Sequence, residues 1–247
     1  MKFEIITVFP EVFPGVLSAG LIGHAIQDET IVIECHNPRD MTTDKHRTVD
    51  DTPFGGGPGM VMKPEPLFAC VESLGEPRPF VILLSPQGIR FDQKIARWLM
   101  TQHKRVALIC GRYEGVDERV RTHLADMDLS IGDFVLSGGE LAAMVVIESV
   151  GRLIPGVVGN SESVAGDSLE DNLLKYPQYT RPRDFRGLTV PEVLLSGNHA
   201  KIEEWRRHQA MLSTKTRRPD LFTCNTTIKN DKRPITSSGD GINEESE

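Results

Sequence analysis

The chain has 247 residues, of which 39% are hydrophobic and 26% charged, and its formal net charge is −7. It is long enough to bury a real core as one large domain or two smaller ones. No apolar run approaches the ~20 residues of a membrane span, and Glu4 stands where a signal peptide would carry no acid. The four widely spaced cysteines fit neither a disulfide framework nor a metal site. We therefore expect a cytoplasmic protein with reduced thiols and no membrane partner.

Charge is distributed unevenly along the chain. Although the whole protein is acidic, residues 172–219 carry 10 basic and 4 acidic side chains, a balance of +6. A basic block inside an acidic protein is a candidate footprint for a polyanion such as a nucleic acid. A solvated helical face would give the same count, so charge alone leaves both interpretations open.

The first 60 residues alternate between apolar and loop-forming segments. Residues 3–9 predict a buried strand that ends at Pro10, and residues 31–33 predict a second strand, with broken helical pieces between them. Residues 36–52 are polar and predict a surface loop. Residues 53–60 contain four glycines and two prolines. They predict a tightly shaped loop, which is either a connector or a ligand contact.

Two further buried strands are predicted at residues 80–85 and 105–110, each followed by a glycine turn. Asp92 is expected to cap a helix that lies between them. The order of strand, glycine turn and helix along the first 150 residues predicts an α/β fold. We expect a parallel sheet with helices on both faces.

The chain is organised around residues 129–140. Residues 134–136 predict a short buried strand, and Ser137 with Glu140 has the spacing of a reciprocal helix cap. The helix predicted to follow, over residues 140–151, is apolar on nearly every face and should lie in the core.

Glycine turns at residues 85–88, 111–115 and 131–139 should meet at the carboxyl edge of the sheet, where such folds bind ligands. Backbone N–H groups near Gly132 and Gly138 would suit a ligand held by the main chain. A plain strand–turn–helix corner would also use glycines, so this pattern alone does not decide between the two.

The remaining sequence predicts a division into parts. Residues 1–155 form the first domain, and residues 156–171 are small, polar and acidic and predict a linker. Residues 172–228 predict a small, helical, basic domain. Residues 229–247 have no core pattern and predict a disordered tail.

Two helices are predicted within the basic domain. A short helix begins near Pro191 and ends at Ser196-Gly197. Asn198 is expected to cap the next one, over residues 199–212. Its apolar face would consist of Ile202, Trp205 and Leu212.

Several motifs, taken together, make the chain resemble the bacterial tRNA (guanine-N1)-methyltransferases of the SPOUT class over residues 7–219. The motifs are His46-Arg47-Thr48-Val49-Asp50-Asp51, residues 53–60, residues 111–115, residues 131–140, Tyr179-Thr180-Arg181-Pro182 and Leu195-Ser196-Gly197-Asn198-His199-Ala200. The resemblance implies a trefoil knot in the first domain, which no apolar pattern would indicate.

The resemblance implies methyl transfer from S-adenosylmethionine to N1 of the guanosine immediately 3′ of the tRNA anticodon. It also implies a homodimer in which the linker of one chain lies over the cofactor of the other. The cofactor-binding residues that it implies are Pro86, Gly111, Tyr113, Glu114, Ser130, Ile131, Gly132, Asp133, Phe134, Val135, Leu136, Gly138 and Gly139.

By the same resemblance, Asp167 is the general base that removes the N1 proton, and Arg152 holds the charge that develops on O6. Composition alone would make Asp167 a solvated linker residue and Arg152 a helix-end cation. Asp50 is a weaker candidate for a supporting role. The family is expected to need Mg²⁺, but the sequence offers no clear carboxylate cage, so no protein ligand to a metal is predicted.

Three other functions are weighed against this one. A methyltransferase of the same fold acting on another RNA would not need the two C-terminal motifs, at residues 179–182 and 195–200. A non-catalytic RNA-binding protein would not need both Asp167 and Arg152. A nucleotide-binding enzyme with a small substrate would leave the basic block unexplained.

Overall fold

The computed structural model of the chain describes residues 1–159, 167–169 and 172–223. The predicted tail at residues 229–247 and most of the predicted linker lie outside the described residues. No described helix is both long and apolar enough to cross a membrane.

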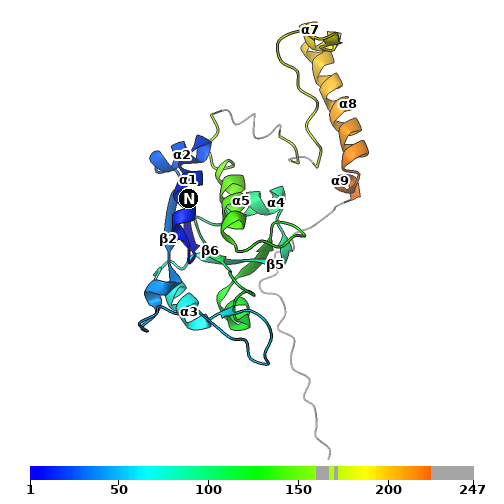
Figure 1. The fold of residues 1–247 in the computed structure, drawn as a ribbon. Coiled ribbons are helices and arrows are strands. Elements are labelled where there is room, and N and C mark those ends of the chain that lie inside the picture. Colours follow the sequence, from blue (N-terminus) through cyan, green and yellow to red (C-terminus); the bar gives the residue numbers. More distant parts are fainter. Residues whose placement is uncertain (160–166, 170–171, 224–247) are drawn as a thin grey trace, which may run out of the picture.

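A five-stranded parallel sheet forms the centre of the first part of the chain (Figure 1). The strand order is β2-β1-β6-β5-β7, and β1 pairs with both β2 and β6. The strands are β1 Lys2–Ile6, β2 Val32–His36, β5 Phe80–Arg90, β6 Arg105–Cys110 and β7 Met127–Ser130. The predicted parallel sheet is confirmed.

Both faces of the sheet are covered, because alternate residues of one strand enter different core clusters. In β6, Val106, Leu108 and Cys110 join one cluster, whereas Ala107 and Ile109 join the other. The first cluster is closed by α1 Phe13–Leu17, α2 Gly20–Gln27, α4 Gln93–Gln102 and α5 Glu140–Gly151. The second is closed by α3 Pro64–Glu72 and the π-helical turn η3 Val120–Leu124 (Figure 1).

Short elements connect these layers. Two 3-10 turns, η1 Pro10–Val12 and η2 Pro38–Met41, follow β1 and β2. The two-residue strands β3 Asp50–Asp51 and β4 Val61–Met62 pair antiparallel on either side of the proline–glycine loop, residues 53–60. As predicted, Asp92 caps α4: its carboxylate accepts a hydrogen bond from the Ile95 N–H at 2.9 Å.

Strand β5 is longer than the sequence predicted. It continues through the expected turn at residues 85–88 to Arg90, and its pairing with β7 changes register between Leu84 and Ile89. A Cβ at Gly88 would lie 2.3 Å from the Leu129 nitrogen. Only glycine therefore lets the irregular part of β5 approach β7 this closely.

The predicted strand at residues 134–136 is wrong. The strand before α5 is β7, and Phe134 and Val135 lie in the following loop with 53% and 85% of their surfaces exposed. A short apolar run beside glycines carries no information on whether its surface is buried within the same chain.

The predicted cap by Ser137 is also wrong, although α5 has the predicted bounds. The N-cap is Gly139, without a side-chain hydrogen bond. The carboxylate of Glu140 instead contacts Thr7 and Arg112, which lie far from it in the sequence.

The basic part of the chain contains a small hairpin and helices. These elements are β8 Asp184–Phe185, β9 Leu188–Thr189, α7 Glu192–Leu195, α8 His199–Arg217 and α9 Asp220–Thr223. Asn198 caps α8 as predicted, accepting a hydrogen bond from Lys201 N–H at 3.1 Å. In Figure 1, α7 and most of α8 stand away from the sheet.

Helix α8 is longer than predicted, and its buried positions differ from the predicted apolar face. Leu212 is half exposed, whereas Ala210 and Thr214 are buried. The Thr214 hydroxyl accepts a hydrogen bond from Leu174 N–H at 2.8 Å, and the Arg206 guanidinium lies 4.9 Å from the Tyr176 ring centroid. The segment before the hairpin therefore packs along α8.

Candidate active site

A cavity of about 340 Å³ opens at the carboxyl edge of the sheet, a size that suits a small-molecule ligand. It is lined from the irregular part of β5, from loop 111–115 after β6 and from loop 131–139 after β7. The prediction that these three segments meet at one edge is confirmed. The predicted cofactor residues that line the cavity are Pro86, Gly111, Tyr113, Glu114, Ser130, Ile131, Gly132, Phe134, Val135, Leu136, Gly138 and Gly139.

Asp133 is the predicted cofactor residue that does not line the cavity. Its side chain is exposed, between Gly132 and Phe134, which both line it. The turn is held from within: the Phe134 N–H donates to the Gly132 carbonyl at 3.0 Å, and the Ser130 hydroxyl donates to the same carbonyl at 3.1 Å.

Loops 111–115 and 131–139 are joined through their backbones. The Gly139 N–H donates to the Gly111 carbonyl at 3.0 Å, and Arg112 forms an isolated antiparallel bridge with Gly138. Tyr113 has a φ of 59°, a left-handed conformation that is uncommon outside glycine and often found at functional sites. The two loops therefore form one continuous cavity wall.

Glycine is required where α5 begins. A Cβ at Gly139 would lie 2.7 Å from the Cα of Cys110, and a Cβ at Gly138 would lie 2.4 Å from Nε of Arg112. The sequence left open whether these glycines form a plain strand–turn–helix corner or a ligand site, and the structure is compatible with both. The glycines permit close packing of the corner, and they leave main-chain groups uncovered beside the cavity.

The proline–glycine loop lies against the cavity wall rather than serving as a remote connector. The Glu114 N–H donates to the Met60 carbonyl, and the Met62 N–H donates to the Gly115 carbonyl, both at 2.9 Å. A Cβ at Gly59 would lie 2.6 Å from the side chain of Glu114. This loop therefore holds Glu114 in place at the cavity.

Several charged side chains of the cavity were missed by the sequence prediction. Arg112 stands within loop 111–115, so attention to that loop could have found it. Glu118 and Arg121 come from η3 and the turn before it, which has no periodic pattern. Arg121 pairs with Asp128 and Glu118 and donates to the Ser85 hydroxyl at 3.3 Å. Burial raises the pKa of the Asp128 carboxyl, and the Arg121 charge opposes that rise.

The predicted catalytic residues contact each other. Arg152, which follows the last residue of α5, donates from Nη2 to Asp167 at 2.5 Å, and Lys175 Nζ donates to the other oxygen of that carboxylate at 3.1 Å. Neither Asp167 nor Arg152 lines the cavity of the described chain. Asp50 does not line it either, and it lies in the β3–β4 pair opposite Met62.

A second hollow, of about 360 Å³, lies on α4 and is lined by side chains of that helix together with Leu169. Its walls come from one helix face and one further residue, so its polar groups all stand on a single element and do not converge from several sides. The cavity at the sheet edge is the better candidate site because its groups come from three segments.

Among the described residues, one cluster has metal-ligand geometry, formed by Glu4, Glu34 and His36. Glu4 is buried, but Lys2 at 2.9 Å and Arg105 at 2.7 Å already neutralise it. Burial would raise the pKa of Glu4, yet hydrogen bonds from Lys2, His36 and Arg105 hold it below its usual value. The described residues near the cavity therefore give no protein cage for Mg²⁺.

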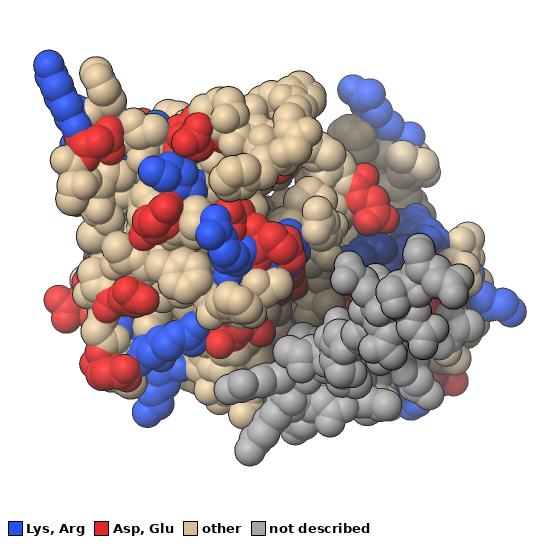
Figure 2. Space-filling view, turned by 90° about the horizontal axis from the view of Figure 1, so that it is seen from below, with Lys and Arg blue, Asp and Glu red and all other residues tan. Residues whose placement is uncertain are grey.

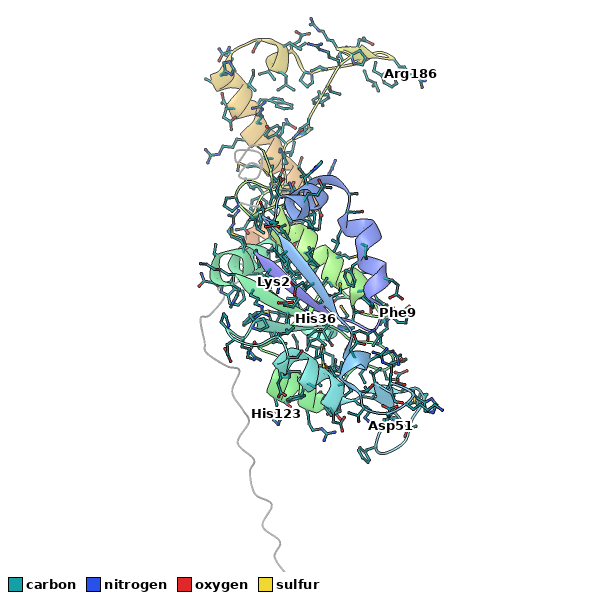
Figure 3. All side chains as sticks on the ribbon, turned by 90° about the vertical axis from the view of Figure 1, so that its left-hand side faces the viewer. Lys2, Phe9, His36, Asp51, His123 and Arg186 are labelled. Carbon is teal, nitrogen blue, oxygen red and sulfur yellow. The ribbon has the colours of Figure 1, made fainter. Side chains whose placement is uncertain are left out.

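Figure 2 shows the molecule from below, with acidic and basic side chains mixed across the described part of that face. Exposed cations of the basic block include Arg207 and Lys215 on α8 and Arg186 at the hairpin. Arg186 occupies the hairpin turn, far from the sheet in Figure 3.

The family profile and the named relatives that match this chain all indicate the same family. The profile of the tRNA (guanine-1)-methyltransferase TrmD family matches residues 1–224. A protein of Gloeobacter violaceus is 56% identical over 223 residues, covering 90% of this chain and 98% of that protein. A protein of Brevibacillus brevis is also 56% identical, covering 90% and 91%. One of Nostoc punctiforme is 54% identical, covering 90% and 93%.

Each of these three relatives is named a tRNA (guanine-N(1)-)-methyltransferase. The match extends over the glycine loops that form the cavity and over the basic block beyond residue 171. The chain belongs to the tRNA (guanine-1)-methyltransferase TrmD family.

Proposed function

We propose that this protein transfers a methyl group from S-adenosylmethionine to N1 of the guanosine immediately 3′ of the tRNA anticodon. The family and the named relatives support the reaction class. The single observation that carries the proposal is the cavity itself. It is formed where three glycine-containing segments from neighbouring strands meet, and it is lined by all the predicted cofactor residues except Asp133.

The cavity residues fit S-adenosylmethionine. Main-chain groups of loops 111–115 and 131–139 would hold the adenosine, since glycine at positions 138 and 139 keeps side chains away from the wall. Glu114 supplies a carboxylate near the rim. When bound, the cofactor supplies an electrophilic methyl group on a sulfonium, so this part of the protein has to align it and exclude water.

Asp167 and Arg152 are assigned the chemistry on guanine. Asp167 would take the proton from N1, and the methyl group would pass from the sulfonium of the cofactor to N1. Such a positioned base contributes about 10²–10⁴-fold. Arg152 stabilises the negative charge that spreads to O6 as the proton leaves. Asp167 contacts Arg152 and Lys175 through different carboxylate oxygens, and each oxygen keeps a further acceptor site for the N1 proton of guanine.

A homodimer would bring this pair to the cavity. Leu141 and Val145 lie one turn apart on α5 and are 55% and 43% exposed, and Phe134 and Val135, which line the cavity, are exposed as well. Exposed apolar side chains on the cavity loop and on the helix that follows it support a partner chain. The linker of one chain would then lie over the cofactor of the other, which accounts for the distance of Asp167 from its own cavity.

We also propose a trefoil knot in residues 1–155, with residues 156–171 as the linker and residues 172–228 as a tRNA-binding domain. Support for the knot comes from the family, whose profile matches residues 1–224. Support for the tRNA-binding role comes from the exposed Arg207, Lys215 and Arg217 on α8. Because its substrate would be tRNA, we expect the enzyme in the cytoplasm. No step is assigned to Mg²⁺.

The test is methyl transfer from labelled S-adenosylmethionine to a tRNA that has guanosine 3′ of the anticodon. The matched control is the same tRNA with adenosine at that position. We expect N1-methylguanosine in the first tRNA and none in the second, and Asp167→Ala should lose about 10²-fold or more while still binding both substrates. Methylation of both tRNAs, or of ribosomal RNA alone, would contradict the assigned substrate. Full activity in Asp167→Ala would remove Asp167 as the base.

A further inference from the structure

Glu140 is a nearly fully buried carboxylate, with 3% of its surface exposed, at the first residue of α5. A buried charge is tolerated when hydrogen bonds and an opposite charge compensate it. The Thr7 hydroxyl donates to Glu140 Oε1 at 2.8 Å, and Arg112 Nε approaches both carboxylate oxygens at 3.3 Å. Glu140 is thus compensated by residues that follow β1 and β6.

The partners of Glu140 hold further parts of the site. Arg112 Nη1 donates to the Ser137 carbonyl at 3.3 Å, and its guanidinium lies 4.4 Å from the Phe9 ring centroid. Thr7 also accepts a hydrogen bond from the Phe9 N–H at 3.0 Å. One carboxylate therefore connects the end of β1, loop 111–115 and loop 131–139.

Gly138 lies directly against this ion pair. A Cβ at Gly138 would lie 2.4 Å from Arg112 Nε and 2.5 Å from Glu140 Oε2. Arg112, Ser137 and Gly138 line the cavity, whereas Glu140 lies behind it. A shift of the Glu140–Arg112 pair would therefore reach the cavity wall through Arg112, which lines the cavity itself, and through Gly138, which lies against the pair.

We propose that Glu140 is a positioning residue, whose charge sets the spacing of loops 111–115 and 131–139 through Arg112 and Thr7. The inference rests on the proposed function, because it assigns the spaced loops to S-adenosylmethionine. A charged pair out of water attracts more strongly than a neutral hydrogen bond of the same shape. Glutamine at position 140 would keep the shape and lose that attraction.

The experiment compares Glu140→Gln with Glu72→Gln, which makes the same change at an exposed position of α3 that does not line the cavity. S-adenosylmethionine binding is measured by calorimetry, and KM for tRNA and the thermal midpoint are measured alongside. We expect Glu140→Gln to weaken S-adenosylmethionine binding about 10- to 100-fold, the range expected for losing a hydrogen bond to a charged group. KM for tRNA should stay within about twofold, and Glu72→Gln should match the native protein.

Thr7 and Arg112 give variants that keep the proposal testable if Glu140→Gln does not fold. Thr7→Ser retains the hydroxyl and should bind like the native protein, whereas Thr7→Val should bind more weakly. Arg112→Lys keeps a cation but loses the geometry that reaches Ser137, and it too should weaken S-adenosylmethionine binding.

The outcomes separate two failures. A native protein that binds no S-adenosylmethionine would overturn the proposed function and this inference with it. If the native protein binds S-adenosylmethionine and Glu140→Gln binds it equally well, this inference alone is overturned. If Glu140→Gln does not fold, native affinity in both Thr7→Val and Arg112→Lys has the same consequence. A fall in thermal midpoint with unchanged affinity would likewise make Glu140 a purely structural residue.

Discussion

The cavity and the Asp167–Arg152 pair are constructed in different ways. The cavity wall is joined by backbone hydrogen bonds between Gly139 and Gly111 and is held from behind by the buried Glu140. The pair is a side-chain contact in which the Arg152 side chain is 44% and the Asp167 side chain 30% exposed, and Lys175 shares it. The wall is preorganised within one chain, whereas the pair can exchange its partners at low cost.

This difference indicates how the work of the enzyme is divided. A site for a diffusible cofactor gains affinity when its groups are already in place. If Asp167 is the proposed base, it has to meet a nucleotide in a large RNA, and its partly exposed ion pairs would allow the movement. We therefore expect substitutions in the wall to affect S-adenosylmethionine binding and substitutions in the pair to affect turnover.

The largest expected effect comes from mixing Asp167→Ala and Gly139→Ala at an S-adenosylmethionine concentration too low for Gly139→Ala to bind it, so that each variant alone is nearly inactive. If the cavity of one chain uses Asp167 of the other, a mixed dimer contains one complete site. Random exchange then makes about half of the dimers mixed and restores roughly a quarter of native activity. The measurement is methyl transfer after the two proteins have been exchanged under mild denaturant.

The control is each variant taken through the same exchange alone, which should stay inactive. If the mixture is no more active than the separate variants, the cavity of one chain does not use Asp167 of the other. Asp167 would then serve the cavity of its own chain, and the linker would have to move within one chain.

A smaller effect is expected for Gly139→Ala by itself. The added methyl would meet the Cα of Cys110, so backbone must shift, which costs about 1–3 kcal/mol of unfolding free energy. S-adenosylmethionine affinity should fall about tenfold or more, since loop 131–139 begins to separate from loop 111–115. Chemical denaturation and calorimetry measure the two quantities.

The matched control is Gly15→Ala in α1, where an added Cβ meets nothing within 4 Å. Its stability should equal or slightly exceed the native value, because alanine is the better helix former. An equal loss of cofactor affinity in both glycine variants would show that close packing at Gly139 is not what shapes the cavity.

The smallest effect is expected on the basic helix. Arg207→Ala combined with Lys215→Ala removes two exposed cations from α8. If each contacts a phosphate, the slope of log affinity for tRNA against log salt should fall by about 1 per residue, and KM for tRNA should rise severalfold. S-adenosylmethionine binding should not change. Lys104→Ala, an exposed change just before β6, serves as control and should leave the salt dependence intact.

Much of the fold could be predicted because its signals are local. Strand β6 and the first half of β5 are almost continuous apolar runs, and β1 is apolar apart from Lys2 and Glu4, as expected for a sheet covered on both faces. Strand β7 was missed because it has four residues and includes Asp128, whose charge Arg121 neutralises only in the folded chain. The apolar pattern instead predicted a strand at residues 134–136, where Phe134 and Val135 are exposed and suit a partner rather than the chain's own core.

The same contrast between local signals and long-range contacts applies to the candidate site. The three glycine segments were found because glycine marks the strand ends where ligands bind. The role of Glu140 was not found, because its partner Thr7 lies 133 positions away and the local spacing suggested a helix cap. Asp167 and Arg152 came from family resemblance alone, and their places in a working site remain a prediction.

The cysteines also have a practical consequence for labelling chemistry. Burial raises the pKa of Cys70 to about 12 and that of Cys110 well above its usual value, and both thiols are inaccessible. Cys35 is the exposed thiol among the described residues, on edge strand β2 at the opposite side of the sheet from β7. Once Cys224, outside the described residues, is replaced by serine, a maleimide dye at Cys35 would report on the enzyme without touching its cavity.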